Sequence, residues 1–211
     1  MGGSKTKLLY SRRMAPDSDT LNYSPEELCG RIAKLTSGIM EFWKHSSGWA
    51  PAEAAGLLDA SMLDWQISLA ESLSRWIGSA SSGDLILAWA NLGALVEGQL
   101  KLFLCVYYHD YKTDVDAIRK KGKLADPDGC ELEPLRQFFV KRIWDAGVNW
   151  NPYVQEVQQR RNAIHAFKHR DIGTFTEWHE ALRLHLSFVR YTGGGLPYPD
   201  VGEYFYGIRE T

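Results

Sequence analysis

The sequence lacks the motifs by which several large enzyme classes are recognised. It contains no glycine-rich phosphate-binding loop, no G-x-S-x-G nucleophile elbow and no H-E-x-x-H zinc motif. Its three cysteines, Cys29, Cys105 and Cys130, are odd in number and widely spaced, which argues against a disulfide framework and against a cysteine zinc site. We therefore expect no metal or other cofactor, and a reducing, cytoplasmic location.

Long apolar runs and an excess of charge are missing as well. No run is long enough to cross a bilayer, and MGGSKTKLLYSRRM is not the hydrophobic segment of a secretory signal, so we expect no membrane association. Met1-Gly2 followed by Thr6 fits the loose N-myristoylation pattern, which does not decide whether Gly2 is lipidated. Lys plus Arg number 24 against 26 Asp plus Glu, which argues against a protein that coats nucleic acid by its net charge.

Helical periodicity is what the sequence does contain. Apolar residues recur at helical spacing through most of the 211 residues, and capping boxes at Ser24–Glu27 and Thr174–Glu177 predict the starts of the first and last helices. Residues 83–108 are apolar nearly all round, which predicts the buried centre of a bundle. These patterns indicate one all-α domain, an up-and-down bundle of about five to six helices. The predicted helices begin near residues 24, 51, 83, 132, 151 and 174; the second runs to Gly78, and Asn151-Pro152 caps the fifth.

The chain divides into an arm, a bundle and a tail. Residues 1–23 are polar and predict a flexible N-terminal arm, and the bundle is predicted for residues 24–191. Residues 192–211 form an aromatic C-terminal tail, which we expect to dock on the bundle. The polar connector 111–131 predicts either a short helix or a hairpin. It carries a basic cluster that consists of Arg119, Lys120, Lys121 and Lys123.

Two arginines stand at an unexpected place in the fifth predicted helix. Val157 and Ile164 belong to an apolar stripe at helical spacing, yet Arg161 fills the stripe position between them and Arg160 lies beside it. A charge that faces a core costs several kcal/mol unless it is paired. Glu97, a carboxylate in the predicted central helix, is the candidate partner for one of the two arginines.

His165 adds a possible chemistry to these arginines. It follows Arg161 by four residues, so on an ideal helix the two side chains share a face. An arginine that holds a phosphate and a histidine that moves protons are sufficient for metal-independent cleavage of RNA, in which the 2′-hydroxyl attacks the adjacent phosphorus. A structural ion pair with a capping histidine explains the same residues, and the residues alone favour it. A metal shared by His165 and His169 lacks a nearby carboxylate to complete its ligands.

The run RRNAIHAF, on a late helix behind a long helix that carries GALVEGQLKLFL, resembles the HEPN superfamily. The signature of that superfamily is an arginine, four to six residues and then a histidine, and the resemblance covers the bundle from Ser24 to Tyr191. In the commoner family pattern the arginine is followed at once by Asn, Asp or His. Here Arg160 is followed by Arg161, and Asn162 stands one place later.

The resemblance implies a HEPN-like fold and a metal-independent endoribonuclease of a toxin or defence type. Its implied catalytic residues are Arg160 and Arg161 on the scissile phosphate, His165 as general acid and base, and Asn162 and Glu97 to orient them. Because the family typically builds its site across two copies, the resemblance also implies a homodimer. It further implies RNA as substrate and a cognate antitoxin or other protein as partner.

Two alternatives remain beside the ribonuclease. Many members of the superfamily are non-catalytic, so the chain is alternatively a HEPN-like dimeric binding or adaptor module in which the arginines form ion pairs. It is also conceivable as a plain helical scaffold that is recognised through its aromatic tail. Lys168 and Arg170, just past the histidine, are candidates for RNA binding, and a solvated helix end explains them as well.

Overall fold

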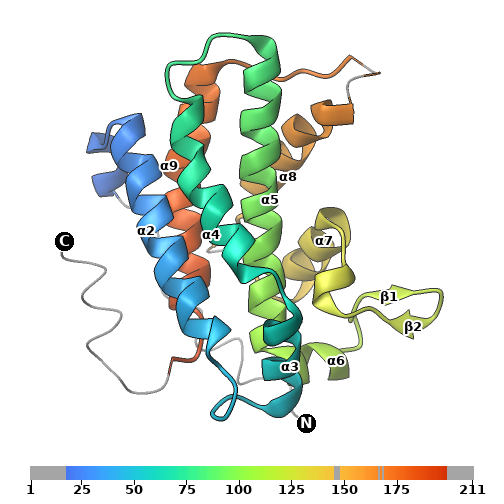
Figure 1. Cartoon of the computed structure of the whole chain (residues 1–211). Coiled ribbons are helices and arrows are strands. Elements are labelled where there is room, and N and C mark those ends of the chain that lie inside the picture. Colours follow the sequence, from blue (N-terminus) through green and yellow to red (C-terminus); the bar gives the residue numbers. More distant parts are fainter. Residues whose placement is uncertain (1–17, 145–147, 166, 168, 199–211) are drawn as a thin grey trace.

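The computed structural model describes residues 18–144, 148–165, 167 and 169–198, and these form an all-α bundle, as the sequence predicts. Its three long helices are α2 (Pro25–Lys44), α5 (Ser82–Val106) and α9 (Phe175–Gly194). Helix α4 (Leu63–Ser72) packs against α2 and α5, and α8 (Asn151–Arg161) packs along α5 (Figure 1). The likeness of this bundle to the HEPN fold stays a prediction.

Shorter elements complete the described part of the chain. Two short helices, α6 and α7, pack against α5, and the hairpin β1–β2 lies between them in the sequence (Figure 1). The symbol η denotes a 3-10 helix. The shorter elements are η1 (Ser18–Asn22), α3 (Ala52–Ala60), η2 (Leu73–Trp76), α6 (Tyr108–Thr113), β1 (Arg119–Lys120), β2 (Lys123–Leu124), η3 (Pro127–Gly129), α7 (Leu132–Arg142) and η4 (Asn162–His165).

Both predicted capping boxes are confirmed. At the start of α2, Ser24 Oγ accepts a hydrogen bond from the Glu27 N–H at 3.2 Å, and Glu27 Oε2 accepts one from the Ser24 N–H at 2.7 Å. Thr174 and Glu177 make the same reciprocal pair at the start of α9, at 3.2 and 2.7 Å. These side chains satisfy backbone donors that the first turn of a helix leaves free, so both helices begin where the pattern predicts.

Helix α5 lies at the centre of the core. Its Trp89, Leu92 and Leu100 are fully buried, and they belong to one hydrophobic cluster that also takes in residues of α2, α8 and α9. The predicted burial of this helix on nearly all sides is wrong at Leu87, which is 45% exposed. Leu87 lies on the same side of α5 as Ala94, which is only partly buried, so one side of the central helix reaches the surface.

The prediction of a single helix over residues 51–78 is wrong. The segment forms α3, α4 and η2, and the break between α3 and α4 lies at Ser61, whose backbone is extended and whose hydroxyl donates to the Leu57 carbonyl at 2.8 Å. This bond satisfies a carbonyl that the end of α3 leaves free. In an unbroken helix Met62 and Trp65 would continue the apolar stripe. After the break Leu63 is buried instead, and Met62 and Trp65 are 59% and 66% exposed.

Residues 18–23 are not part of a flexible arm, which corrects the predicted boundary at residue 23. Residues 18–22 form η1, and the segment is held to α9 by polar contacts: Asp19 pairs with Arg190 at 3.2 Å, and Arg183 donates to the Tyr23 carbonyl at 2.8 Å. Thr20 is 1% exposed. The polar residues that suggested an arm are instead used to bind the basic side chains of α9, while residues 1–17 lie outside the described part.

The last helix continues to Gly194, beyond the predicted end of the bundle at residue 191. After it, the Tyr198 ring packs against the rings of Phe42 and Trp43, with centroid distances of 4.9 and 5.8 Å. The beginning of the tail therefore contacts α2. Residues 199–211 lie outside the described part, so docking of the remaining aromatic tail stays a prediction.

Candidate functional site

The two arginines lie at the end of α8, whose start differs from the prediction. Asn151 is the first residue of the helix and does not cap it; Trp150 precedes it, and Asn149 Oδ1 accepts a hydrogen bond from the Asn151 N–H at 3.1 Å. The Asn151 side chain is engaged elsewhere, because its Oδ1 accepts a hydrogen bond from Arg136. The helix ends at Arg161, so both arginines stand in its last turn.

Arg161 pairs with Glu97, which confirms the predicted partner of one arginine. Its Nη1 lies 2.8 Å from Glu97 Oε2 and also donates to the Gly93 carbonyl at 3.4 Å. Lys101 Nζ binds the other carboxylate oxygen at 2.7 Å. Burial by itself would raise the pKa of Glu97, but hydrogen bonds from Lys101 and Arg161 outweigh it and lower the pKa below its ordinary value. The carboxylate is therefore held ionised between two cations.

Gly93 makes this pair possible. A Cβ atom at residue 93 would lie 2.3 Å from Arg161 Cδ and 2.9 Å from Arg161 Cβ, so only glycine admits the arginine stem. Gly98 similarly admits Gln66 of α4, whose Oε1 would lie 2.0 Å from an added Cβ. Glycines that flank Glu97 favour the close approach of a neighbouring backbone, but the structure places side chains at both positions.

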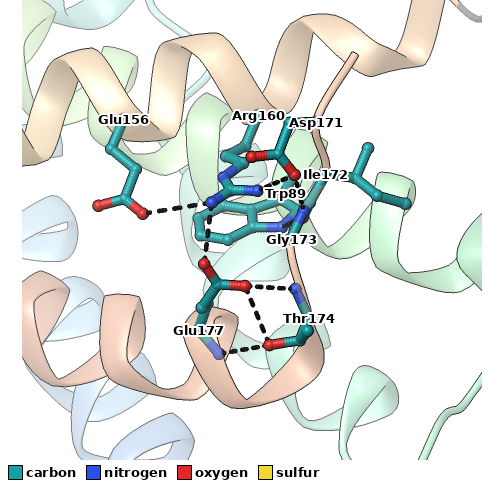
Figure 2. A network of polar contacts seen from close by, with 8 residues as sticks. All are labelled: Trp89, Glu156, Arg160, Asp171, Ile172, Gly173, Thr174 and Glu177. Atoms are coloured by element: carbon teal, nitrogen blue, oxygen red, sulfur yellow. Dashed lines mark hydrogen bonds and ion pairs between the residues drawn. The ribbon is translucent and has the colours of Figure 1, made fainter. Parts of the chain in front are cut away.

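Arg160 lies in a second polar network, which joins α8 to the start of α9 (Figure 2). Its Nη1 lies 2.8 Å from Asp171 Oδ1, and its Nη2 lies 3.0 Å from Glu177 Oε1 and 4.0 Å from Glu156 Oε1. The Arg160 side chain is only 11% exposed. Glu177 is also the acidic member of the α9 capping box, so one carboxylate both caps that helix and binds the arginine.

Trp89 and Gly173 support the same network. The guanidinium carbon of Arg160 lies 5.9 Å from the centre of the Trp89 ring, and the indole N–H donates to the Ile172 carbonyl at 2.9 Å (Figure 2). Gly173 has φ of +65°, and a Cβ there would lie 2.5 Å from Arg160 Nη1. The segment before α9 is thus shaped around the arginine and held to the central helix.

His165 is not joined to either arginine. The α-helix ends at Arg161 and the chain continues as the 3-10 helix η4, so the predicted common face of Arg161 and His165 on one continuous helix is wrong. The His165 side chain is exposed, and it makes no hydrogen bond or ion pair with any described residue. The apolar stripe ends here too, because Ile164 is 48% exposed and Phe167 is fully exposed.

The remaining predicted site residues are dispersed. Asn162 follows α8 and makes no side-chain hydrogen bond within the described residues, and Arg170 is exposed. Lys168 lies outside the described part, so its predicted role in RNA binding is not addressed. In the part of the chain that the structure describes, no group of three or more His, Cys, Asp or Glu side chains is placed to hold a metal ion.

The sequence reasoning missed four residues that complete these networks: Trp89, Lys101, Asp171 and Glu177. Lys101 carried a usable signal, because it follows Glu97 by four residues on one helix face. Glu177 was identified as a cap but not as the partner of Arg160. Asp171 and Trp89 carried no such signal, since their contacts with the end of α8 depend on how distant segments pack.

The two arginines connect the end of α8 to two other parts of the bundle. Arg161 ties the end of α8 to α5, and Arg160 ties it to the segment that opens α9. Each guanidinium already faces carboxylate oxygens of the chain itself. A phosphate would have to displace these carboxylates before either arginine could bind it.

Among the described residues, no helix combines the length and the apolar composition needed to cross a membrane. Comparison of the chain with protein-family models, with curated proteins and with solved structures found no match.

Proposed function

We propose that this chain is a non-catalytic, HEPN-like binding module that works as a homodimer in the cytoplasm. The observation that carries the proposal is that Arg160 and Arg161 are both paired with carboxylates of the chain, while His165 makes no contact with either of them. Charged groups that neutralise one another within the fold leave little field for an external phosphate, and removing one partner would leave the other charge buried and unpaired.

The contact surface of this module follows α8 and consists of Ile164, His165, Phe167 and Arg170. It exposes Ile164 by 48% and Phe167 completely, next to the exposed His165 and Arg170. Large apolar side chains at the surface are ordinary when scattered, but two of them within four residues favour a role in association. A second copy of the chain is the partner we propose, and an antitoxin or other protein is the alternative occupant of the same surface.

A cytoplasmic location is supported by the cysteines. Cys29, Cys105 and Cys130 are all buried and free. Burial raises the pKa of Cys29 to about 12, and burial together with the nearby carboxylates of Asp128 and Asp126 raises that of Cys105 to about 12 as well. Thiols of this kind do not serve as nucleophiles.

The dimer is tested by size-exclusion chromatography with light scattering. The wild-type chain should elute as a dimer, and Phe167→Ser should shift it to the monomer mass, because the change removes an apolar contact of the proposed interface. The variant should still fold, since a fully exposed side chain contributes nothing to the monomer fold. Val115→Ser is the matched control, since Val115 is 88% exposed in another part of the molecule and should leave the dimer intact. A monomeric wild-type chain would contradict the homodimer.

A metal-independent endoribonuclease is the second candidate, favoured by the exposed and unpaired imidazole of His165. Purified chain is incubated with mixed RNA in EDTA, beside His165→Ala and Arg160→Ala. We expect equal, background RNA loss in all three samples. Cleavage that leaves 2′,3′-cyclic phosphate ends and disappears in His165→Ala would establish the ribonuclease and refute the non-catalytic module.

A further inference from the structure

The hairpin β1–β2 is a basic projection that neither proposed function uses. Its two strands pair in antiparallel register, Arg119 opposite Leu124 and Lys120 opposite Lys123. Lys121 and Gly122 form the turn with φ of +52° and +78°, as in the tight turns that match the twist of a hairpin. Figure 1 shows the hairpin standing out from the bundle beside α6 and α7.

The base of the hairpin is held firmly. The Tyr111 hydroxyl donates to the Ala125 carbonyl at 2.7 Å, and the Ala125 N–H donates to the Ile118 carbonyl at 2.9 Å. Tyr111 is 2% exposed, so these bonds anchor both strands to the core. An isolated two-stranded hairpin is marginally stable in water, and this anchor lets the projection keep its shape.

The four cations of the hairpin lack ion-pair partners among the described residues. Arg119, Lys120, Lys121 and Lys123 are all exposed, and none forms an ion pair with a described residue; Lys120 Nζ donates to the Gly129 carbonyl at 2.6 Å. None of the acidic residues nearest in the sequence forms an ion pair with these four cations, although Asp126 and Asp128 keep their negative charge. Asp114 and Asp116 pair with Arg142 and Lys141, Asp126 accepts from Tyr108, and Asp128 accepts from the Gly129 N–H.

Two features of this charge placement are unfavourable for the isolated hairpin. Lys120 and Lys123 are directly opposite one another, and like charges at opposed positions destabilise a strand pair. Lys121 holds a left-handed backbone conformation that Asn or Gly would adopt at lower cost. An anionic ligand bound across the two strands would relieve the repulsion, so the placement points to such a ligand.

We propose that this hairpin binds double-helical DNA by inserting into its major groove. A two-stranded ribbon fits that groove, which is about 12 Å wide, and cations on both strands match phosphates on both of its walls. A single acidic peptide presents no second wall. The hairpin has no exposed apolar side chain, whereas binding at a membrane surface needs apolar residues beside the cations.

The test is fluorescence anisotropy of a short labelled duplex DNA at roughly 50 mM salt, with the wild-type chain and with Lys121→Asn/Lys123→Gln. Asn suits the left-handed turn and Gln removes the cross-strand repulsion, so this variant keeps its hairpin. We expect DNA affinity to fall at least about tenfold, and the slope of log K against log salt to flatten by about two, since each phosphate contact contributes about 0.9.

The matched control is Lys44→Gln/Arg75→Gln, which removes the same charge outside the hairpin, from the exposed Arg75 and from the partly exposed Lys44 that pairs with Asp64, and should leave affinity unchanged within about twofold. Equal losses in both double variants would overturn the proposal, as would an absence of DNA binding. Binding to phosphatidylserine vesicles or to polyglutamate in place of DNA would overturn it too. None of these outcomes depends on whether the chain dimerises or cleaves RNA.

Discussion

Gly93 carries no side chain, and this is what lets Arg161 reach Glu97. The arginine stem lies where a Cβ would stand, and its guanidinium continues to the carboxylate 2.8 Å away. Both side chains are mostly buried, at 23% and 19% exposure, so the pair is screened less than a surface ion pair. A small change at residue 93 therefore acts on a charge interaction four residues further along α5.

Gly93→Ala should destabilise the protein by about 1–3 kcal/mol, because the added methyl forces Arg161 away and weakens its ion pair. Combining Gly93→Ala with Arg161→Ala should cost less than the sum of the single changes, since the clash is then gone. Urea denaturation measures both effects. Gly30→Ala is the control: nothing lies within 4 Å of its added Cβ in α2, so it should stabilise by roughly 0.5–1 kcal/mol. A Gly93→Ala protein as stable as the wild type would contradict the proposed role of this glycine.

Helices α2 and α9 begin with the same capping motif but differ in what the motif binds. Glu27 caps α2 and forms no ion pair within the described residues, whereas Glu177 caps α9 and also binds Arg160 at 3.0 Å. The second contact joins the start of α9 to the end of α8. The capping box of α9 therefore also makes a tertiary contact, whereas the capping box of α2 caps only its own helix.

Glu177→Ala should therefore destabilise more than Glu27→Ala. Each change removes one side of a capping box, which costs about 1 kcal/mol, and Glu177→Ala also leaves the mostly buried Arg160 with one carboxylate fewer, which adds about 1–2 kcal/mol. Thermal unfolding gives the difference between the two variants. Hydrogen exchange should quicken at residues 172–174 in Glu177→Ala alone. Equal destabilisation of both variants would mean that Arg160 contributes nothing to this contact.

The molecule as a whole rests on one core, and that core contains a titratable group. His185 of α9 is completely buried, and its Nδ1 shares a hydrogen bond with the Tyr153 hydroxyl of α8 at 2.9 Å. Trp150 and Phe188 lie nearby in the same aromatic cluster. Burial lowers the pKa of His185 to about 3, so the imidazole is neutral in the folded protein at neutral pH.

Global stability should fall as the solution is acidified through the range between the two pKa values of His185. The unfolded chain takes up a proton near its pKa of about 6.5, while the folded chain resists it down to about 3, so stability is fully present above pH 6.5 and declines below it. Between pH 7 and 5 this single group should remove about 2 kcal/mol. Urea denaturation at both pH values should show that loss in the wild type and a smaller one in His185→Asn.

His45→Asn is the control for this experiment, because His45 is 75% exposed in its side chain. It should keep the pH dependence of the wild type. If His185→Asn retained the whole of that dependence, the buried imidazole would not be its source.

Much of the architecture follows from local patterns. The two capping boxes, the buried α5 and the need for a partner at Glu97 could all be read from the sequence, because they depend on helical spacing within a few residues. The sequence did not decide between a hairpin and a short helix at 119–124, because this segment has one apolar residue, Leu124, and therefore too little periodicity to choose. The prediction of an unbroken helix over residues 51–78 is wrong because the chain leaves the helix at Ser61 although apolar residues continue at helical spacing.

The partners of the arginines were decided only by the tertiary structure. Arg160 and Arg161 are neighbours with the same side chain; the apolar stripe placed Arg161 toward the core, but it did not identify which partner each arginine would bind. In the packed structure Arg161 passes Gly93 and binds Glu97. Arg160 lies beside the Trp89 ring and binds Asp171 and Glu177. The end of α8 at Arg161 then separates His165 from both. Sequence spacing describes one helix, whereas an ion pair depends on how closely separate segments approach, and that distance is set by the whole core.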